Sequence, residues 1–187
     1  MGLDMYLYAE KYISGYDYTK DHKKVINPEN QQIRDIFPEM IKTDNLDSIT
    51  IRHEVGYWRK ANHIHKWFVD NCQDGNDDCR DSYVSREQLK ELLELCKQVV
   101  KDSEMREGTV TNGYRIEESG RVPILEAGEY IVDSTTAQRL LPTEEGFFFG
   151  STDYDQWYMK DIELTIEIIE RCLKLPDDYE LYYHSSW

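Results

Sequence analysis

The apolar residues of this chain recur with two different periods, and this restricts the fold more than any other feature of the sequence. Residues 2–9 and 48–55 alternate between apolar and polar side chains, which is typical of strands with one buried face. Residues 57–72 and 86–102 instead place apolar side chains three and four positions apart, which predicts amphipathic helices. The chain therefore needs both a sheet and helices that pack against it.

Capping residues mark where two of the long helices begin. Ser85 followed three residues later by Gln88 is a capping box, in which each side chain binds a backbone N–H at the start of a helix. Asp153 followed by Gln156 has the same spacing, so the last long helix is predicted to begin after Asp153 and to end before Pro176. Weaker patterns predict short helices at 29–36 and 134–141, and strands at 130–132, 147–149 and 179–184.

The segment 103–133 differs in composition from the rest of the chain. It contains the dipeptide Asn112-Gly113, which is a strong signal of a two-residue hairpin turn. We interpret 103–133 as a hairpin excursion within a single domain that spans residues 1–187, because roughly 100 to 200 residues is usual for one domain.

The order of the predicted elements favours the α+β class. Strands and helices do not alternate regularly, as they do around a parallel sheet. We expect a single layer of mostly antiparallel sheet, packed by about three long helices. The order of the strands is not determined by the pattern.

The charge is strongly negative and restricts the partners. The chain has 22 Lys and Arg against 37 Asp and Glu, a formal charge of −15. This argues against direct binding of nucleic acid, because phosphates require a cationic face. No run approaches the roughly 18 apolar residues of a membrane helix, and no secretory segment precedes the four cysteines. We expect a cytoplasmic protein that contacts no membrane, and its oligomeric state stays open.

The first candidate site is the junction at residues 56–62, where a strand is expected to pass directly into a helix. Backbone N–H groups at a helix N-terminus lack intrahelical partners and attract anions. Arg59 and Lys60 would hold the charge of a phosphate or carboxylate there, Asn62 a polar edge, and Tyr57 or Trp58 would stack on the ligand. In the alternative interpretation, these cations only pair with the surplus of carboxylates.

The second candidate site is the junction that follows residues 147–149. The proposed ligand-binding residues are Ser151, Thr152, Asp153, Tyr154 and Trp157. Helix capping explains only one of the hydroxyl and carboxyl groups. If both junctions end at the same sheet edge, they face each other across a groove lined by the aromatic side chains of both. In the alternative interpretation, these aromatic residues belong to the core.

Motifs for metal binding and catalysis are weak. Cys72 and Cys79 are seven residues apart, which is wider than usual zinc spacings. His63 is expected on the outer face of its helix and His65 beside the apolar face, so the two do not face one ligand. His53 alternates with polar residues and is expected to be buried. Nucleophile and glycine-rich phosphate motifs are absent. We therefore expect no metal and no cofactor, and we favour binding over catalysis.

Four segments carry a resemblance to a known family: GYWRKANHIHKWF at 56–68, YVSREQLKELLELC at 83–96, LLPTEEGFFFGSTDYDQWY at 140–158, and the ending YYHSSW. They are similar to a family of small acidic proteins of bacteriophages and prophages. That family is uncharacterised, so the resemblance implies a context and no activity. The implied context is a phage-type accessory protein in the host bacterial cytoplasm, where blocking host defence or redirecting host enzymes is a common task.

Three functions follow as hypotheses. The first is a non-enzymatic protein that inhibits a host protein by docking its acidic surface on a basic partner. The second is a protein that binds or sequesters a small nucleotide-like anion with Arg59, Lys60 and Asn62. The third is a hydrolase that uses Asp153, Asp155 and His65.

Overall fold

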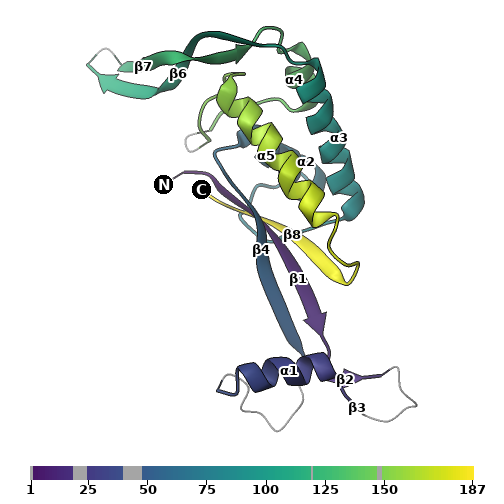
Figure 1. The fold of residues 1–187 in the computed structure, drawn as a ribbon. Helices are drawn as coiled ribbons and strands as arrows, with labels where there is room; N and C mark the ends of the chain where they lie inside the picture. The colour runs from purple at the N-terminus through teal and green to yellow at the C-terminus, as the bar shows by residue number, and fades with distance from the viewer. Residues whose placement is uncertain (1, 19–24, 40–47, 119, 147–148) are drawn as a thin grey trace.

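The computed structural model describes residues 2–18, 25–39, 48–118, 120–146 and 149–187 (Figure 1). An antiparallel sheet has the strand order β4-β1-β8-β5, with the bounds β1 Asp4–Ile13, β4 Ile49–Arg59, β5 Ser82–Val84 and β8 Tyr179–Ser186. The long helices are α2 Asn62–Cys72, α3 Arg86–Asp102 and α5 Gln156–Cys172. The predicted α+β class, with a mostly antiparallel sheet and about three long helices, is confirmed.

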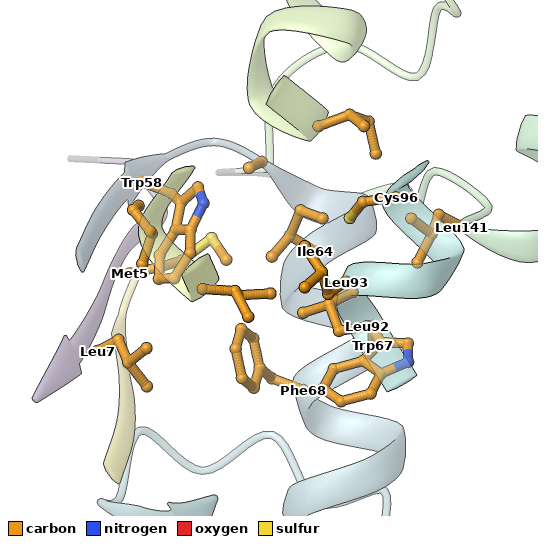
Figure 2. Close-up of a cluster of buried hydrophobic side chains, with 14 of the residues drawn as sticks. Met5, Leu7, Trp58, Ile64, Trp67, Phe68, Leu92, Leu93, Cys96 and Leu141 are labelled. Atoms are coloured by element: carbon orange, nitrogen blue, oxygen red, sulfur yellow. The ribbon is translucent and has the colours of Figure 1, made fainter. Parts of the chain in front are cut away.

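The core lies between one face of this sheet and the helices. Met5 and Leu7 of β1 are fully buried, as period-two alternation predicts. Figure 2 shows both side chains in one cluster with Phe68 of α2 and Leu92 of α3. Phe68 also stacks on Tyr183 of β8, with ring centres 4.1 Å apart. Chain segments far apart in sequence therefore share one apolar cluster.

Strand β4 continues past Gly56, so the prediction of a helix that begins at Tyr57 is wrong. The ladder with β1 extends to Arg59, and α2 begins only at Asn62. A Cβ atom added at Gly56 would lie 2.6 Å from Cγ2 of Ile168. This glycine therefore allows α5 to approach the strand closely, and it does not end the strand.

Residues 50–54 of β4 are exposed, contrary to the prediction that one face of this strand is buried. Ile51 is 42% exposed, and His53, which we expected to be buried, is also exposed. Figure 1 shows β1 and β4 extending together away from α2, α3 and α5 toward α1. The alternating pattern predicted a strand correctly, but none of the three long helices, α2, α3 and α5, covers this end of it.

The predicted hairpin is present, but its turn lies elsewhere. It consists of β6 Met105–Glu117 and β7 Gly120–Ile131. Asn112 and Gly113 lie inside β6, where the register shifts between Thr111 and Tyr114, and Gly113 has φ of +94°. The left-handed preference of this dipeptide is therefore used in a bulge, and the chain reverses between Glu117 and Gly120.

The smaller elements are β2 Tyr16–Asp17, β3 Val25–Ile26, α1 Pro28–Ile36 and α4 Thr135–Leu140. The two helices confirm the predictions for 29–36 and 134–141. The strand predicted at 147–149 falls mainly on residues 147 and 148, which lie outside the described residues. Within the described ranges, no helix is both long enough and apolar enough to cross a membrane.

Candidate functional site

A cavity of about 610 Å³ lies between the two junctions, and we call it the junction pocket. Its walls come from the end of β4 and the start of α2, from loop residues 143–153, and from the start of α5. Residues 111–114 of the hairpin add a further wall. The two junctions therefore border one cavity, an arrangement that the sequence left open. The contribution of the hairpin was not predicted.

The rim of the pocket is cationic although the chain is acidic. Arg59 has a side chain 59% exposed, and its Nη1 lies 3.9 Å from Oδ1 of Asp4. Lys160 places Nζ 4.3 Å from the centre of the Trp157 ring, which is itself 42% exposed. In the part of the chain that the structure describes, neither Lys60 nor Lys160 forms an ion pair. The two lysine ammonium groups are therefore available to an anionic ligand.

Lys60 has an unusual backbone conformation at this rim. Its φ is 61°, in the left-handed region that residues with a Cβ atom seldom occupy. Its N–H donates to the carbonyl of Leu3 at 2.8 Å, and its carbonyl accepts from the N–H of Asn62 at 2.9 Å. The conformation costs about 1–2 kcal/mol for a residue other than glycine, and it lets the chain turn from β4 into α2 beside the pocket.

Asn62 lies in the wall as a tether for the neighbouring loop. Its side chain is buried, and Nδ2 donates to the carbonyls of Phe149 at 3.0 Å and Ser151 at 2.8 Å. Oδ1 accepts from the N–H of Glu144 at 3.0 Å. Both protons of the amide nitrogen are already used, so Asn62 shapes the pocket and has no N–H group left for the polar edge of a ligand, where we expected it to bind.

Asp155, and not Asp153, caps α5, and it forms part of the pocket floor. Oδ1 of Asp155 accepts from the N–H groups of Trp157 at 2.8 Å and Tyr158 at 3.2 Å. The residue is 3% exposed, and Oδ2 is buried without a hydrogen-bond partner among the described residues. Burial raises the pKa of this carboxyl above its ordinary value. One oxygen of Asp155 therefore caps the helix, and the other has no hydrogen-bond partner among the described residues.

His63 is the second buried polar group of the floor. It was expected on the outer face of its helix, yet it is only 3% exposed because its ring packs 4.2 Å from that of Tyr158. Burial lowers the pKa of the imidazole to about 3, so the ring is neutral at pH 7. Nε2 has no hydrogen-bond partner in the described ranges.

Asp161 completes the polar lining, one turn along α5 from Trp157. Burial, with a smaller contribution from the charge of Asp155, raises the pKa of the Asp161 carboxyl to about 7. The pocket therefore holds two carboxyl groups and one neutral imidazole whose titration is shifted by burial. Such shifts are typical of functional sites.

Two predicted residues of the first junction lie outside the pocket lining. Trp58 is 1% exposed and donates its Nε1–H to Oγ1 of Thr165 at 2.9 Å, so the prediction that it stacks on a ligand is wrong. It alternates onto the core face of β4. Tyr57 lies on the opposite face of the strand, where its hydroxyl donates to Asp4 at 2.5 Å.

Two residues of the second junction face a neighbouring cavity. Thr152 and Tyr154 line a smaller space of about 420 Å³ beside the hairpin. The hydroxyl of Tyr154 accepts from the N–H of Thr143 at 3.1 Å. Of the ten predicted residues, the junction pocket is lined by Arg59, Lys60, Asn62, Ser151, Asp153 and Trp157.

His65 does not belong to the pocket. It is fully buried, with Nδ1 2.7 Å from the hydroxyl of Tyr183 and Nε2 3.0 Å from Oδ2 of Asp77. Both ring nitrogens thus have structural partners. The hydrolase hypothesis combined His65 with Asp153 and Asp155, but the histidine that lines the cavity with these two residues is His63.

Sequence reasoning missed the residues that α5 brings to the pocket. Trp157 was identified, but its neighbours Lys160 and Asp161 lie three and four positions later, on the same side of the helix. This spacing was a usable signal. The hairpin wall had no comparable signal, because it depends on how the hairpin packs beside Asp155 and Gln156.

Among the described residues, no group of three or more His, Cys, Asp or Glu side chains is arranged to hold a metal ion. Comparisons with models of protein families, with curated proteins and with solved structures found no match for this chain.

Proposed function

We propose that this chain binds a small anionic ligand with a flat ring system, such as a nucleotide, in the junction pocket. The observation that carries this proposal is the cationic rim of Arg59, Lys60 and Lys160 on a chain of formal charge −15. The cations of an acidic protein ordinarily pair with its surplus carboxylates. Lys60 and Lys160, which form no ion pair among the described residues, lie with Arg59 beside this cavity, and cations gathered in this way raise the local concentration of an anion.

The size and lining of the pocket fit such a ligand. A volume of about 610 Å³ falls within the range of roughly 300–1,000 Å³ that is usual for small-molecule sites. Trp157 supplies a half-exposed indole on which a planar group can stack. Ser151 and Asp153 add hydroxyl and carboxylate groups at the second junction.

The test is a thermal-shift screen followed by calorimetry with nucleoside 5′-monophosphates and diphosphates, because a ligand of the folded state raises its stability. Lys60→Asn is the informative variant, since asparagine tolerates positive φ and removes the charge. We expect it to weaken binding about tenfold, which is the loss of one charge-assisted contact. Lys90→Ala, which removes an exposed cation of α3, is the matched control and is expected to change affinity less than twofold.

Two results would contradict the proposal. One is a panel in which no anion raises the melting temperature or gives heat of binding. The other is an equal effect of Lys60→Asn and Lys90→Ala, since it would trace the affinity to net charge and not to the pocket.

The phage context and the docking of an acidic surface on a basic host protein stay predictions. Docking of that kind depends on long-range electrostatics, so salt should weaken it. Affinity capture from a bacterial lysate, repeated at increasing ionic strength, would test it separately from the pocket.

A further inference from the structure

The floor of the junction pocket contains two buried polar atoms without partners. Asp155 and His63 are each 3% exposed, and Asp155 Oδ2 and His63 Nε2 lack hydrogen bonds among the described residues. Folded proteins satisfy about nine in ten of their buried polar atoms, and leaving one unsatisfied costs about 1–3 kcal/mol. Both residues belong to the lining of the same cavity.

The chemistry of these atoms differs from that of the rim. Because Oδ1 of Asp155 already accepts two backbone N–H groups, Oδ2 is the carboxyl oxygen left to accept a hydrogen bond from a ligand. The imidazole of His63 is neutral, so it brings no positive charge. A phosphate would be repelled from this floor, with Asp161 as a further carboxyl group nearby. The pocket is therefore polarised between a cationic rim and an acceptor-rich floor.

We infer that the floor binds an N–H donor of the ligand at Asp155 Oδ2, beside His63, while the rim binds its anionic end. The inference rests on the proposed function and narrows it to one ligand class, a nucleotide whose base carries an exocyclic amino group. The amino group donates to Asp155, the ring of the base lies beside Trp157, and the phosphate reaches Arg59 and Lys60.

Two pairs of nucleotides test this inference on the unmodified protein. Cytidine and uridine 5′-monophosphate share the sugar phosphate but present an amino and a carbonyl group, respectively, at the same ring position. Adenosine and inosine 5′-monophosphate form a second such pair. We expect the amino member of at least one pair to bind ten or more times more tightly, because a carbonyl opposite the carboxylate leaves two acceptors face to face.

Asp155→Asn identifies the group responsible. Asparagine is also a good N-cap, so Oδ1 can still hold the start of α5. We expect this variant to reduce the preference to less than threefold, since the amide nitrogen would face the amino group. Glu163→Gln removes an exposed carboxylate of the same helix that lies outside the pocket lining, and it should leave the preference unchanged. Thermal melts establish that both variants are folded.

The outcomes separate this inference from the proposed function. The inference fails if both members of each pair bind within twofold of each other, or if the carbonyl member binds more tightly. The floor would then not recognise an amino group, but the pocket would still be a site for anions. If other anions bind and none of these nucleotides does, the ligand class is wrong. If no anion binds at all, the proposed function fails as well. Should Asp155→Asn fail to fold, the comparison of pairs on the unmodified protein still decides.

Discussion

Replacing Asn62 with alanine tests whether this side chain holds the pocket wall. It would remove three hydrogen bonds, from Nδ2 to the carbonyls of Phe149 and Ser151 and from the N–H of Glu144 to Oδ1. A net contribution of about 0.5–1.5 kcal/mol for each bond predicts a loss of about 3 kcal/mol in the free energy of unfolding. For a chain of this length, such a loss lowers the melting temperature by about 6–12 °C.

The loss should be accompanied by a local change in the pocket loop. In this variant the amide of Glu144 has lost its acceptor. We expect it to exchange with solvent faster than in the unmodified protein, while the amides in the core of α3 are less affected. Urea unfolding measures the free energy, and hydrogen exchange resolved to the residue measures the local effect. Because the loop carries Ser151 of the pocket wall, affinity for the anionic ligand should also fall.

Asn71→Ala is the matched control in the same helix. Asn71 is exposed, and its side chain makes one hydrogen bond, from Nδ2 to the carbonyl of Trp67 at 2.8 Å. Its loss should cost less than about 1 kcal/mol. Equal losses for the two variants, or a loss below about 1 kcal/mol for Asn62→Ala, would refute the argument that Asn62 tethers the loop.

Three further predictions concern the core and the titrating groups. The carboxyl group of Asp161 has a pKa of about 7 in the folded protein and an ordinary pKa of 3.8. Its ionisation therefore lowers the free energy of unfolding by the full amount above pH 7 and has no effect below pH 3.8. Asp161→Asn should therefore stabilise the protein at pH 8 by at most about 4 kcal/mol and have no effect at pH 3.5, measured by urea unfolding at both values. Gly56→Ala should destabilise the protein by about 1–3 kcal/mol, because its Cβ would meet Ile168 at 2.6 Å, and an unchanged melting temperature would contradict this packing. Iodoacetamide at pH 8 should label Cys79 first, as mass spectrometry can show, because burial raises the thiol pKa values to about 11 or 12 at the other cysteines, Cys72, Cys96 and Cys172.

The elements predicted best are those that depend on local interactions. Helix α3 has the predicted bounds, and the capping box of Ser85 and Gln88 is formed, because its members lie three residues apart. The same signal failed at Asp153. There, Asp155 caps α5 instead, and it forms a bridge to Tyr130 of the hairpin. A long-range contact selected between two candidate capping residues that lie two positions apart.

The aromatic residues show the same division. Both Trp58 and Trp157 were expected to line a groove, and nothing in the local sequence separates them. Trp58 is buried because the ladder with β1 carries β4 on to Arg59 and turns this indole toward Thr165. Trp157 remains half-exposed because it lies in the first turn of α5, which borders the junction pocket.

The sequence by itself determined the α+β class, the main helices and strands, and the two cation- and hydroxyl-bearing junctions, because periodicity, capping and charge act within a few residues. Only the tertiary structure decided that both junctions border one pocket, that the hairpin closes a side of it, and that His63 and Asp155 form its floor. Those features depend on contacts between segments up to about one hundred residues apart. The energy of such contacts comes from burial and packing, which a local pattern does not specify.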